Sequence, residues 1–381
     1  TAVTSKGSHS PREEHRASHL KKNRAMTTTE LIRHRLINQQ IAGTQFTRPD
    51  QIVSWLVAMQ AQEYAMSKWA IGLRLPAIHE QDVEKAFDHG KILRTHLMRP
   101  TWHFVTPADI RWLLALTAPQ VHAKSAYMYR QTSLDSKVFR KSNDAIAKAL
   151  EGGHHLTRTE LQAVLRDKKI IADGFKLGYL MMNAELEQII CSGKRRGKQF
   201  TYALLSERAP KARTLTREES LSELLNRYFQ SRSPATIQDF CTWSGLSLKE
   251  SQSALDSNKK KLVAETIDGK KYWVAASAPS IKSASVSKDL AAFLMPDYDE
   301  YGMGYKDRSA IFDQNAHAAA VSRGNPVFNR MIIVDGKIAG TWKAAVERKK
   351  LTIQMVPFKP LTKMNVAKVA NAVERFKGFI E

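Results

Sequence analysis

The chain has 381 residues, of which 43% are hydrophobic and 25% charged, and this composition excludes a wholly disordered or fibrous protein. At roughly 100 to 200 residues per domain, the length predicts two or three domains. Lysine and arginine outnumber aspartate and glutamate by 59 to 37, for a formal net charge of +22; because such an excess attracts polyanions, we expect nucleic acid as the partner, with anionic membranes or mere solubility as alternatives.

Apolar runs and cysteines predict the compartment. No run approaches the roughly 18 uninterrupted apolar residues of a membrane span, and the first residues lack the apolar core of a secretory signal. Cys191 and Cys241 lie far apart, which excludes a disulfide framework and a cysteine-rich zinc site. We expect a cytoplasmic, nucleoid-associated protein without membrane contact, and we interpret the polar residues 1–25 as a disordered basic tail or an upstream-derived extension.

The segment after the tail is expected to form a winged helix with additional helices. Its helices are predicted over about Thr29–Ile41, Pro49–Met59 and Asp82–Phe87, and its strands over Ile92–Leu97 and Thr101–Val105. A further helix begins at Thr106-Pro107, because proline favours the first helical turn. More helices are expected to about residue 150.

The clearest helix start follows at Thr157, which forms a capping-box pattern with Glu160. A second apolar stripe runs from Leu177 to Ala184, and the residues then alternate as in two strands, Ile189–Cys191 and Phe200–Leu204. Helices followed by a hairpin predict a second winged helix.

The loop between these two strands carries four cations in five positions. The cations are Lys194, Arg195, Arg196 and Lys198, with Gly197 among them. Such a loop can follow a groove of DNA and neutralise phosphates without reading the base sequence. We expect this hairpin to bind DNA; the alternative is a solvated turn.

A third unit repeats the same plan. Thr216 and Glu219 form another capping-box pattern, and a short helix opens at Thr236 and closes at Gly245. After a third helix, Asp268-Gly269 is a strong two-residue hairpin turn.

Strands predominate after residue 280. A second hairpin turn is predicted at Asp335-Gly336, between strands at Met331–Val334 and Lys337–Trp342. A further strand is predicted at Leu351–Val356, where apolar and polar residues alternate, and an amphipathic helix spans about Val366–Phe376.

Together these patterns predict an α+β fold of tandem winged helices, each a helix-turn-helix plus a β-hairpin, with a C-terminal β-rich module. The expected divisions are the tail at 1–25, the first winged helix with extra helices at 26–150, the second at 151–212, the third at 213–278 and the α+β module at 279–381. We expect a basic concave face that holds duplex DNA.

Signatures of the commoner enzyme classes are absent from the sequence. It has no phosphate-cradling loop, no Gly-x-Gly-x-x-Gly opening a helix, no Gly-x-Ser-x-Gly and no His-Glu-x-x-His. His154-His155 lacks a third ligand nearby, and no histidines accompany the acidic run 297–300, whose acids we interpret as turn caps that pair with Arg308. We expect neither a metal nor another cofactor.

Four segments carry a family pattern: Gln60-Ala61-Gln62, Arg94–Val105, Pro234–Leu246 and Leu294–Arg308. In this order they resemble the AlkZ/YcaQ family, bacterial tandem winged-helix proteins that include DNA glycosylases acting on alkylated bases and interstrand crosslinks. The resemblance extends from about residue 28 to residue 380. A Gln-x-Gln triplet occurs by chance, so the specificity lies in the four segments together.

The resemblance implies that Gln60 and Gln62 are catalytic, in the Gln-x-Gln form of the AlkZ branch; the other branch has Asp at the second position. A glycosidase normally needs one carboxyl to protonate the leaving group and another to activate water. An N7- or N3-alkylated purine is already cationic and departs as a neutral base, so two amides suffice to orient water and stabilise a sugar cation. Without the resemblance, both residues would be interpreted as an exposed polar helix end.

Two further features bear on the site. His103 alternates away from Trp102 and Phe104, and we expect it, with Thr101, to contact a phosphate or the lesion-bearing nucleotide; a satisfied structural histidine is the alternative. Lys68 is the lysine nearest to the motif, and nothing in the sequence marks it as a Schiff-base nucleophile, which favours direct attack by water.

The function implied by the resemblance is that of a monofunctional DNA glycosylase, which hydrolyses the N-glycosidic bond of cationic alkylated purines and unhooks crosslinks. Its expected partner is double-stranded DNA, contacted by a monomer mainly through the phosphate backbone. The alternative is a non-catalytic winged-helix transcriptional regulator, which predicts a preferred operator and no loss of bases.

Overall fold

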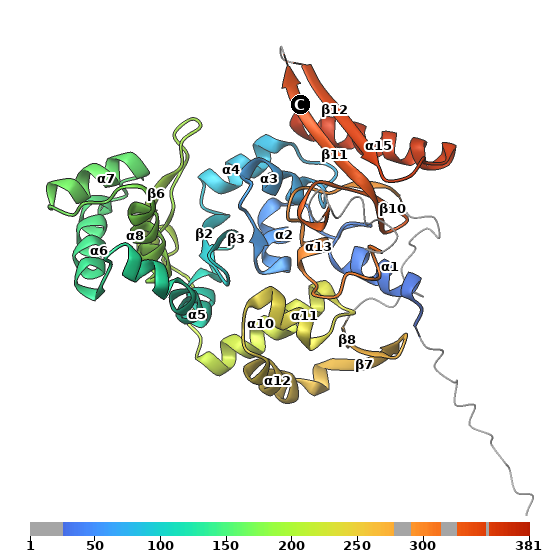
Figure 1. The fold of residues 1–381 in the computed structure, drawn as a ribbon, viewed down its shortest axis with the longest axis horizontal. Helices are drawn as coiled ribbons and strands as arrows, with labels where there is room; N and C mark the ends of the chain where they lie inside the picture. Colours follow the sequence, from blue (N-terminus) through green and yellow to red (C-terminus); the bar gives the residue numbers. More distant parts are fainter. Residues whose placement is uncertain (1–25, 278–290, 314–325, 348–349) are drawn as a thin grey trace, which may run out of the picture.

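The computed structural model describes residues 26–277, 291–313, 326–347 and 350–381, so the predicted tail lies outside the described residues. Helices alternate with small antiparallel sheets along the chain, which confirms the mixed α and β class (Figure 1). Within the described ranges, no helix is long and apolar enough to cross a membrane.

The first part of the chain contains a three-stranded sheet of order β1-β3-β2. Its elements are α1 (Thr28–Asn38), α2 (Pro49–Leu56), β1 (Met59–Gln60), α3 (Tyr64–Gly72), α4 (Glu80–Asp88), β2 (Leu93–Leu97), β3 (Thr101–Val105), α5 (Ile110–Gln131) and α6 (Ser136–Leu150). The two predicted strands and the three predicted helices are present, and the helix expected at Thr106 begins instead at Ile110.

The chain around Met59 differs from the prediction. Helix α2 ends at Leu56 because Val57 adopts a φ of 67°, which a helix does not accommodate. Met59 and Gln60 then pair with β3 as a short strand, so the helical stripe extending to Met59 was wrong. Helix α3 was not predicted, because residues 66–72 are all buried and show no amphipathic stripe.

The second part confirms the predicted helices and hairpin. It comprises β4 (Leu156–Thr157), α7 (Arg158–Asp167), α8 (Gly174–Leu186), β5 (Ile190–Ser192), β6 (Thr201–Leu204) and the short α9 (Leu205–Arg208). The capping box at Thr157 forms as expected: its hydroxyl accepts the Glu160 N–H at 3.3 Å and the Glu160 carboxylate accepts the Thr157 N–H at 2.7 Å. The three strands form a sheet of order β4-β6-β5.

The third part likewise matches the prediction. It comprises α10 (Arg217–Arg232), α11 (Ile237–Ser244), α12 (Leu248–Ser257), β7 (Leu262–Ile267) and β8 (Lys270–Ala275). Gly245 ends α11 with a φ of 76°, and Asp268 and Gly269 both have positive φ, as a tight hairpin turn requires.

The last part is a four-stranded antiparallel sheet of order β12-β11-β10-β9 with one long helix. It comprises β9 (Phe293–Leu294), α13 (Glu300–Met303), β10 (Met331–Val334), β11 (Lys337–Glu347), β12 (Lys350–Pro357) and α15 (Lys363–Ile380). The predicted strands and helix are present, and β11 is longer than expected.

The C-terminal part completes the core of the N-terminal part. Trp69 of α3 is 1% exposed and lies with its ring centroid 5.1 Å from that of Phe376 and 5.2 Å from that of Phe379, both on α15. Trp342 of β11 contacts Phe376 from the sheet side, at 4.8 Å between centroids. Figure 1 shows α15 and the C-terminal sheet beside α3 and α4. The C-terminal part also brings Glu300 of α13 into contact with Gln60 of β1.

Candidate active site

Residues 60–62, here called the Gln loop, are held by backbone hydrogen bonds from several parts of the chain. The Gln60 N–H donates to Glu300 Oε1 at 3.2 Å, and the Ala61 N–H donates to the Trp102 carbonyl at 2.7 Å. Arg94 Nε donates to the Ala61 carbonyl at 3.0 Å. The loop is therefore rigidly placed before any ligand binds.

The two glutamine side chains of the loop differ in exposure. Gln60 is 8% exposed, and its Oε1 lies 3.5 Å from Arg99 Nη2, whereas Gln62 is exposed. The helix-end interpretation is wrong for Gln60, which belongs to strand β1 and is buried. The Gln60 amide is thus held in the protein beside Arg99, whereas the Gln62 side chain is open to solvent.

Glu300 links three parts of the chain behind the Gln loop. Besides the Gln60 N–H, it accepts hydrogen bonds from Arg232 Nη2 at 2.7 Å and Trp243 Nε1 at 2.9 Å. Arg232 in turn donates to the Leu56 carbonyl at 3.0 Å. Both partners of the Glu300–Arg232 ion pair are almost completely buried, with side chains 2% and 0% exposed. This pair anchors the turn that leads from α2 into β1.

The acidic run around Glu300 does not pair as predicted. Its acids form ion pairs with other arginines: Asp297 with Arg330, Asp299 with Arg74 and Glu300 with Arg232. Arg308 donates instead to the Gly302 carbonyl, so the predicted Arg308 pairing was wrong. Among the residues that the structure describes, no cluster of three or more His, Cys, Asp or Glu side chains is placed to hold a metal ion.

His103 is buried and lies beside Gln60, its partner in the pairing of β3 with β1. It is 1% exposed, and its Nδ1 lies 3.0 Å from the Thr101 carbonyl. Burial, reinforced by the charge of Arg99, lowers the pKa of His103 to about 3, so the ring is neutral at pH 7. The side chain is thus enclosed by protein in this structure, and the expected contact of His103 with DNA stays a prediction. Thr101 is half-buried beside it.

In the β5–β6 hairpin, the two arginines form ion pairs with other parts of the protein and the two lysines are exposed. Arg195 forms an ion pair with Glu84 at 2.9 Å, and Arg196 forms one with Glu160 at 2.7 Å. Lys194 and Lys198 are exposed. The sequence therefore overstated the free charge of the hairpin, because two of its arginines hold the hairpin against α4 and α7.

Lys68 is not placed as a free amine. Its side chain is 7% exposed, and its Nζ lies 2.6 Å from the Glu80 carboxylate and 2.5 Å from the Glu84 carboxylate. An ammonium held by two carboxylates is unsuited to Schiff-base formation, which agrees with the expected attack by water.

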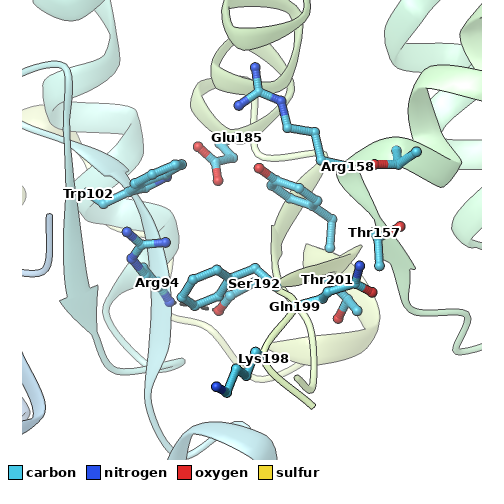
Figure 2. Close-up of a pocket in the computed structure, with 12 residues that line it drawn as sticks. Arg94, Trp102, Thr157, Arg158, Glu185, Ser192, Lys198, Gln199 and Thr201 are labelled. Carbon is cyan, nitrogen blue, oxygen red and sulfur yellow. Dashed lines mark hydrogen bonds between the residues drawn. The ribbon is translucent and has the colours of Figure 1, made fainter. Parts of the chain in front are cut away.

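A pocket of about 330 Å³ lies next to the Gln loop, between the β2–β3 hairpin and the second part of the chain (Figure 2). Its lining combines cations, one carboxylate, aromatic rings and hydroxyl or amide groups: Arg94, Trp102, Thr157, Arg158, Thr159, Glu185, Ser192, Lys198, Gln199, Phe200, Thr201 and Tyr202. Arg94 connects it to the loop, since its Nη2 lies 3.5 Å from the Gln62 carbonyl.

The sequence did not reveal the roles of Arg94, Arg232 and Glu300. Arg94 and Glu300 fall in segments already noted for their resemblance, but nothing local marks them as partners of a loop more than thirty residues away. Their arrangement depends on tertiary packing.

Comparisons with known proteins identify relatives of the chain. A family model described as "DNA glycosylase AlkZ-like" matches residues 53–379. The chain is 22% identical over 335 residues to the interstrand DNA cross-link repair glycosylase of Streptomyces sahachiroi, over 84% of this chain and 90% of that protein. Its fold matches the solved structure of Streptomyces sahachiroi DNA glycosylase AlkZ with a TM-score of 0.77 at 20% identity, over 93% of this chain and 98% of that one.

Proposed function

This chain belongs to the AlkZ-like DNA glycosylase family, and from that premise we propose that it releases cationic alkylated purines from double-stranded DNA. As a DNA glycosylase it binds DNA and hydrolyses N-glycosidic bonds, so the family and the enzyme class expected from the sequence are confirmed. The relative from Streptomyces sahachiroi is a cross-link repair glycosylase, and we extend that substrate to this chain: it unhooks one arm of an interstrand crosslink.

The catalytic step is assigned to Gln60 and Gln62. A purine alkylated at N7 or N3 carries a positive charge and leaves as a neutral base, so its departure needs no acid. The two amides orient the attacking water and stabilise the positive charge that develops on the sugar. The observation that carries this assignment is the fixed backbone of the Gln loop, with hydrogen bonds to Glu300, Trp102 and Arg94.

The three helix-and-hairpin units are proposed to be winged helices, divided at 26–150, 151–212 and 213–278, with a C-terminal module at 279–381. Each unit contains antiparallel strands that follow two or more helices, and in the first unit the helices α5 and α6 come after these strands. The net charge of +22 suits contact with the phosphate backbone by a monomer. The place of action would be the nucleoid in the cytoplasm.

The proposed function is tested on a duplex with one N7-methylguanine and on a duplex with a nitrogen-mustard crosslink. After incubation with the protein, alkali cleaves abasic sites, and strand scission at the lesion is the expected result. An undamaged duplex is the control. No scission on either substrate, together with tight binding to a defined operator, would support the transcriptional regulator instead.

The two exposed lysines of the β5–β6 hairpin are expected to contribute to the salt dependence of DNA binding. In the variant Lys194→Ala/Lys198→Ala, we expect weaker binding to every DNA sequence and a slope of log K against log salt that is flatter by about 2, because each lysine neutralises roughly one phosphate. Fluorescence anisotropy at several salt concentrations measures both. The control variant Lys168→Ala/Lys169→Ala removes the same charge from exposed lysines after α7. An unchanged slope in the hairpin variant would place the DNA contact elsewhere.

A further inference from the structure

The pocket next to the Gln loop shares a side chain with it. The Arg94 guanidinium lies 3.9 Å from the ring centroid of Trp102 and 4.7 Å from that of Phe200. The same guanidinium donates to the Ala61 carbonyl at 3.0 Å. Arg94 is 6% exposed, so it forms a fixed wall between the pocket and the proposed catalytic loop.

The pocket carries excess positive charge. Arg158 and Lys198 are exposed at its rim, and Arg158 begins α7, so the positive end of that helix also faces the pocket. The carboxylate in the lining, Glu185, lies against Nδ1 of the His96 ring and accepts the His96 N–H at 3.3 Å. A negatively charged group is therefore favoured at the rim.

The interior of the pocket combines flat apolar surfaces with hydrogen-bonding groups. Trp102 is half-buried and Tyr202 is 8% exposed, and Figure 2 shows Trp102 and Ser192 on different sides of the open space. Aromatic rings stack on nucleobases, and side-chain hydroxyls and amides bind base edges. At about 330 Å³ the pocket is at the lower end of the range for small ligands, about 300 to 1,000 Å³.

These observations point to one ligand class. We propose that the pocket binds a single unstacked nucleotide of the DNA, with its phosphate near Arg158 and its base among Trp102, Phe200 and Tyr202. A base within a duplex cannot enter such a space without leaving the stack. The inference rests on the proposed function, because it takes DNA as the ligand, and it adds a second binding site beside the Gln loop.

The test uses 2-aminopurine, a base whose fluorescence rises when it leaves the stack. Duplexes contain 2′-fluoro-7-methyldeoxyguanosine, which resists hydrolysis, and 2-aminopurine either opposite this lesion or on its 3′ or 5′ side. The variant Thr159→Trp fills the pocket from an exposed position in its lining, and Ser206→Trp is the matched control at an exposed serine of α9 outside the lining.

We expect the unaltered protein and Ser206→Trp to raise the fluorescence several-fold in at least one of the three positions, and Thr159→Trp to abolish this rise. A rise in no position, or an equal rise with Thr159→Trp, would overturn the proposal. So would saturable binding of free 2-aminopurine deoxynucleoside monophosphate that Thr159→Trp blocks while the duplexes give no signal, because the ligand would then be a free nucleotide.

A second pair of variants tests the phosphate contact. Arg158→Ala should weaken binding to the lesion duplex about tenfold more than Arg166→Ala, an equal loss of charge from an exposed arginine on the same helix. Equal weakening would remove Arg158 from the site and contradict the proposed placement of the phosphate.

The outcomes separate this inference from the proposed function. Release of N7-methylguanine without a pocket-dependent fluorescence change would leave the glycosylase assignment intact and refute the nucleotide pocket. A pocket-dependent change without base release would refute the proposed reaction and leave the pocket.

Discussion

Gln60→Ala and Gln62→Ala are each expected to slow the release of N7-methylguanine at least about 100-fold, while the affinity for DNA changes little. The reason is that a preorganised dipole acts mainly in the transition state, and removing one such group typically costs two to three orders of magnitude in rate. Single-turnover kinetics with excess protein measure the chemical step, and anisotropy measures binding.

The matched control for both substitutions is Gln252→Ala. Gln252 is exposed on α12, and its amide donates to Asp256, one turn further along the helix, so its loss should leave the rate unchanged. If Gln60→Ala and Gln62→Ala retain the rate of the unaltered protein, these residues have no part in the mechanism. If both variants lose affinity in proportion to rate, the glutamines bind DNA rather than act in the transition state.

Glu300→Ala is expected to lower the free energy of unfolding by about 3 to 5 kcal/mol, because it leaves the buried Arg232 guanidinium without its carboxylate partner. Such a loss is a large part of the roughly 5 to 15 kcal/mol that stabilises a typical domain. Urea unfolding followed by tryptophan fluorescence measures it. The control Asp256→Ala breaks an exposed ion pair with Lys259 and should cost about 0 to 1 kcal/mol.

Glu300→Gln separates the stability effect from the effect on the site. The single amide oxygen of glutamine can accept only some of the hydrogen bonds that Gln60, Trp243 and Arg232 donate to the two carboxylate oxygens of Glu300. The protein should still fold, but the Gln loop should be less firmly held. We expect slower base release at unchanged DNA affinity. A variant that unfolds more easily yet keeps the full rate would limit Glu300 to a structural role.

The elements predicted correctly depend on local chemistry. The capping box at Thr157 and the turn at Asp268-Gly269 are decided by residues within a few positions of each other. Strand β1 and helix α3 were missed because neither shows a periodic pattern of apolar residues. Strand β1 has only two residues, and helix α3 is buried over most of its length.

In the candidate site, too, the sequence revealed some residues but not the contacts between distant parts of the chain. Gln60 and Gln62 were identified from the resemblance of the chain to a family, whereas Glu300 reaches Gln60 across 240 positions. The hairpin cations were found as a cluster, but the sequence could not indicate that Arg195 and Arg196 pair with Glu84 and Glu160. Spacing along the chain does not encode contacts that only the packed molecule creates.

The contact between α3 and α15 has a consequence for biosynthesis. Trp69 is synthesised long before Phe376 and Phe379, which complete its surroundings, and at the usual rates of translation the interval is some tens of seconds. Glu300 also emerges late, so the nascent chain exposes the Gln loop without its anchor. The hydrogen bond that anchors Gln60 can therefore form only after α13 has left the ribosome, late in synthesis.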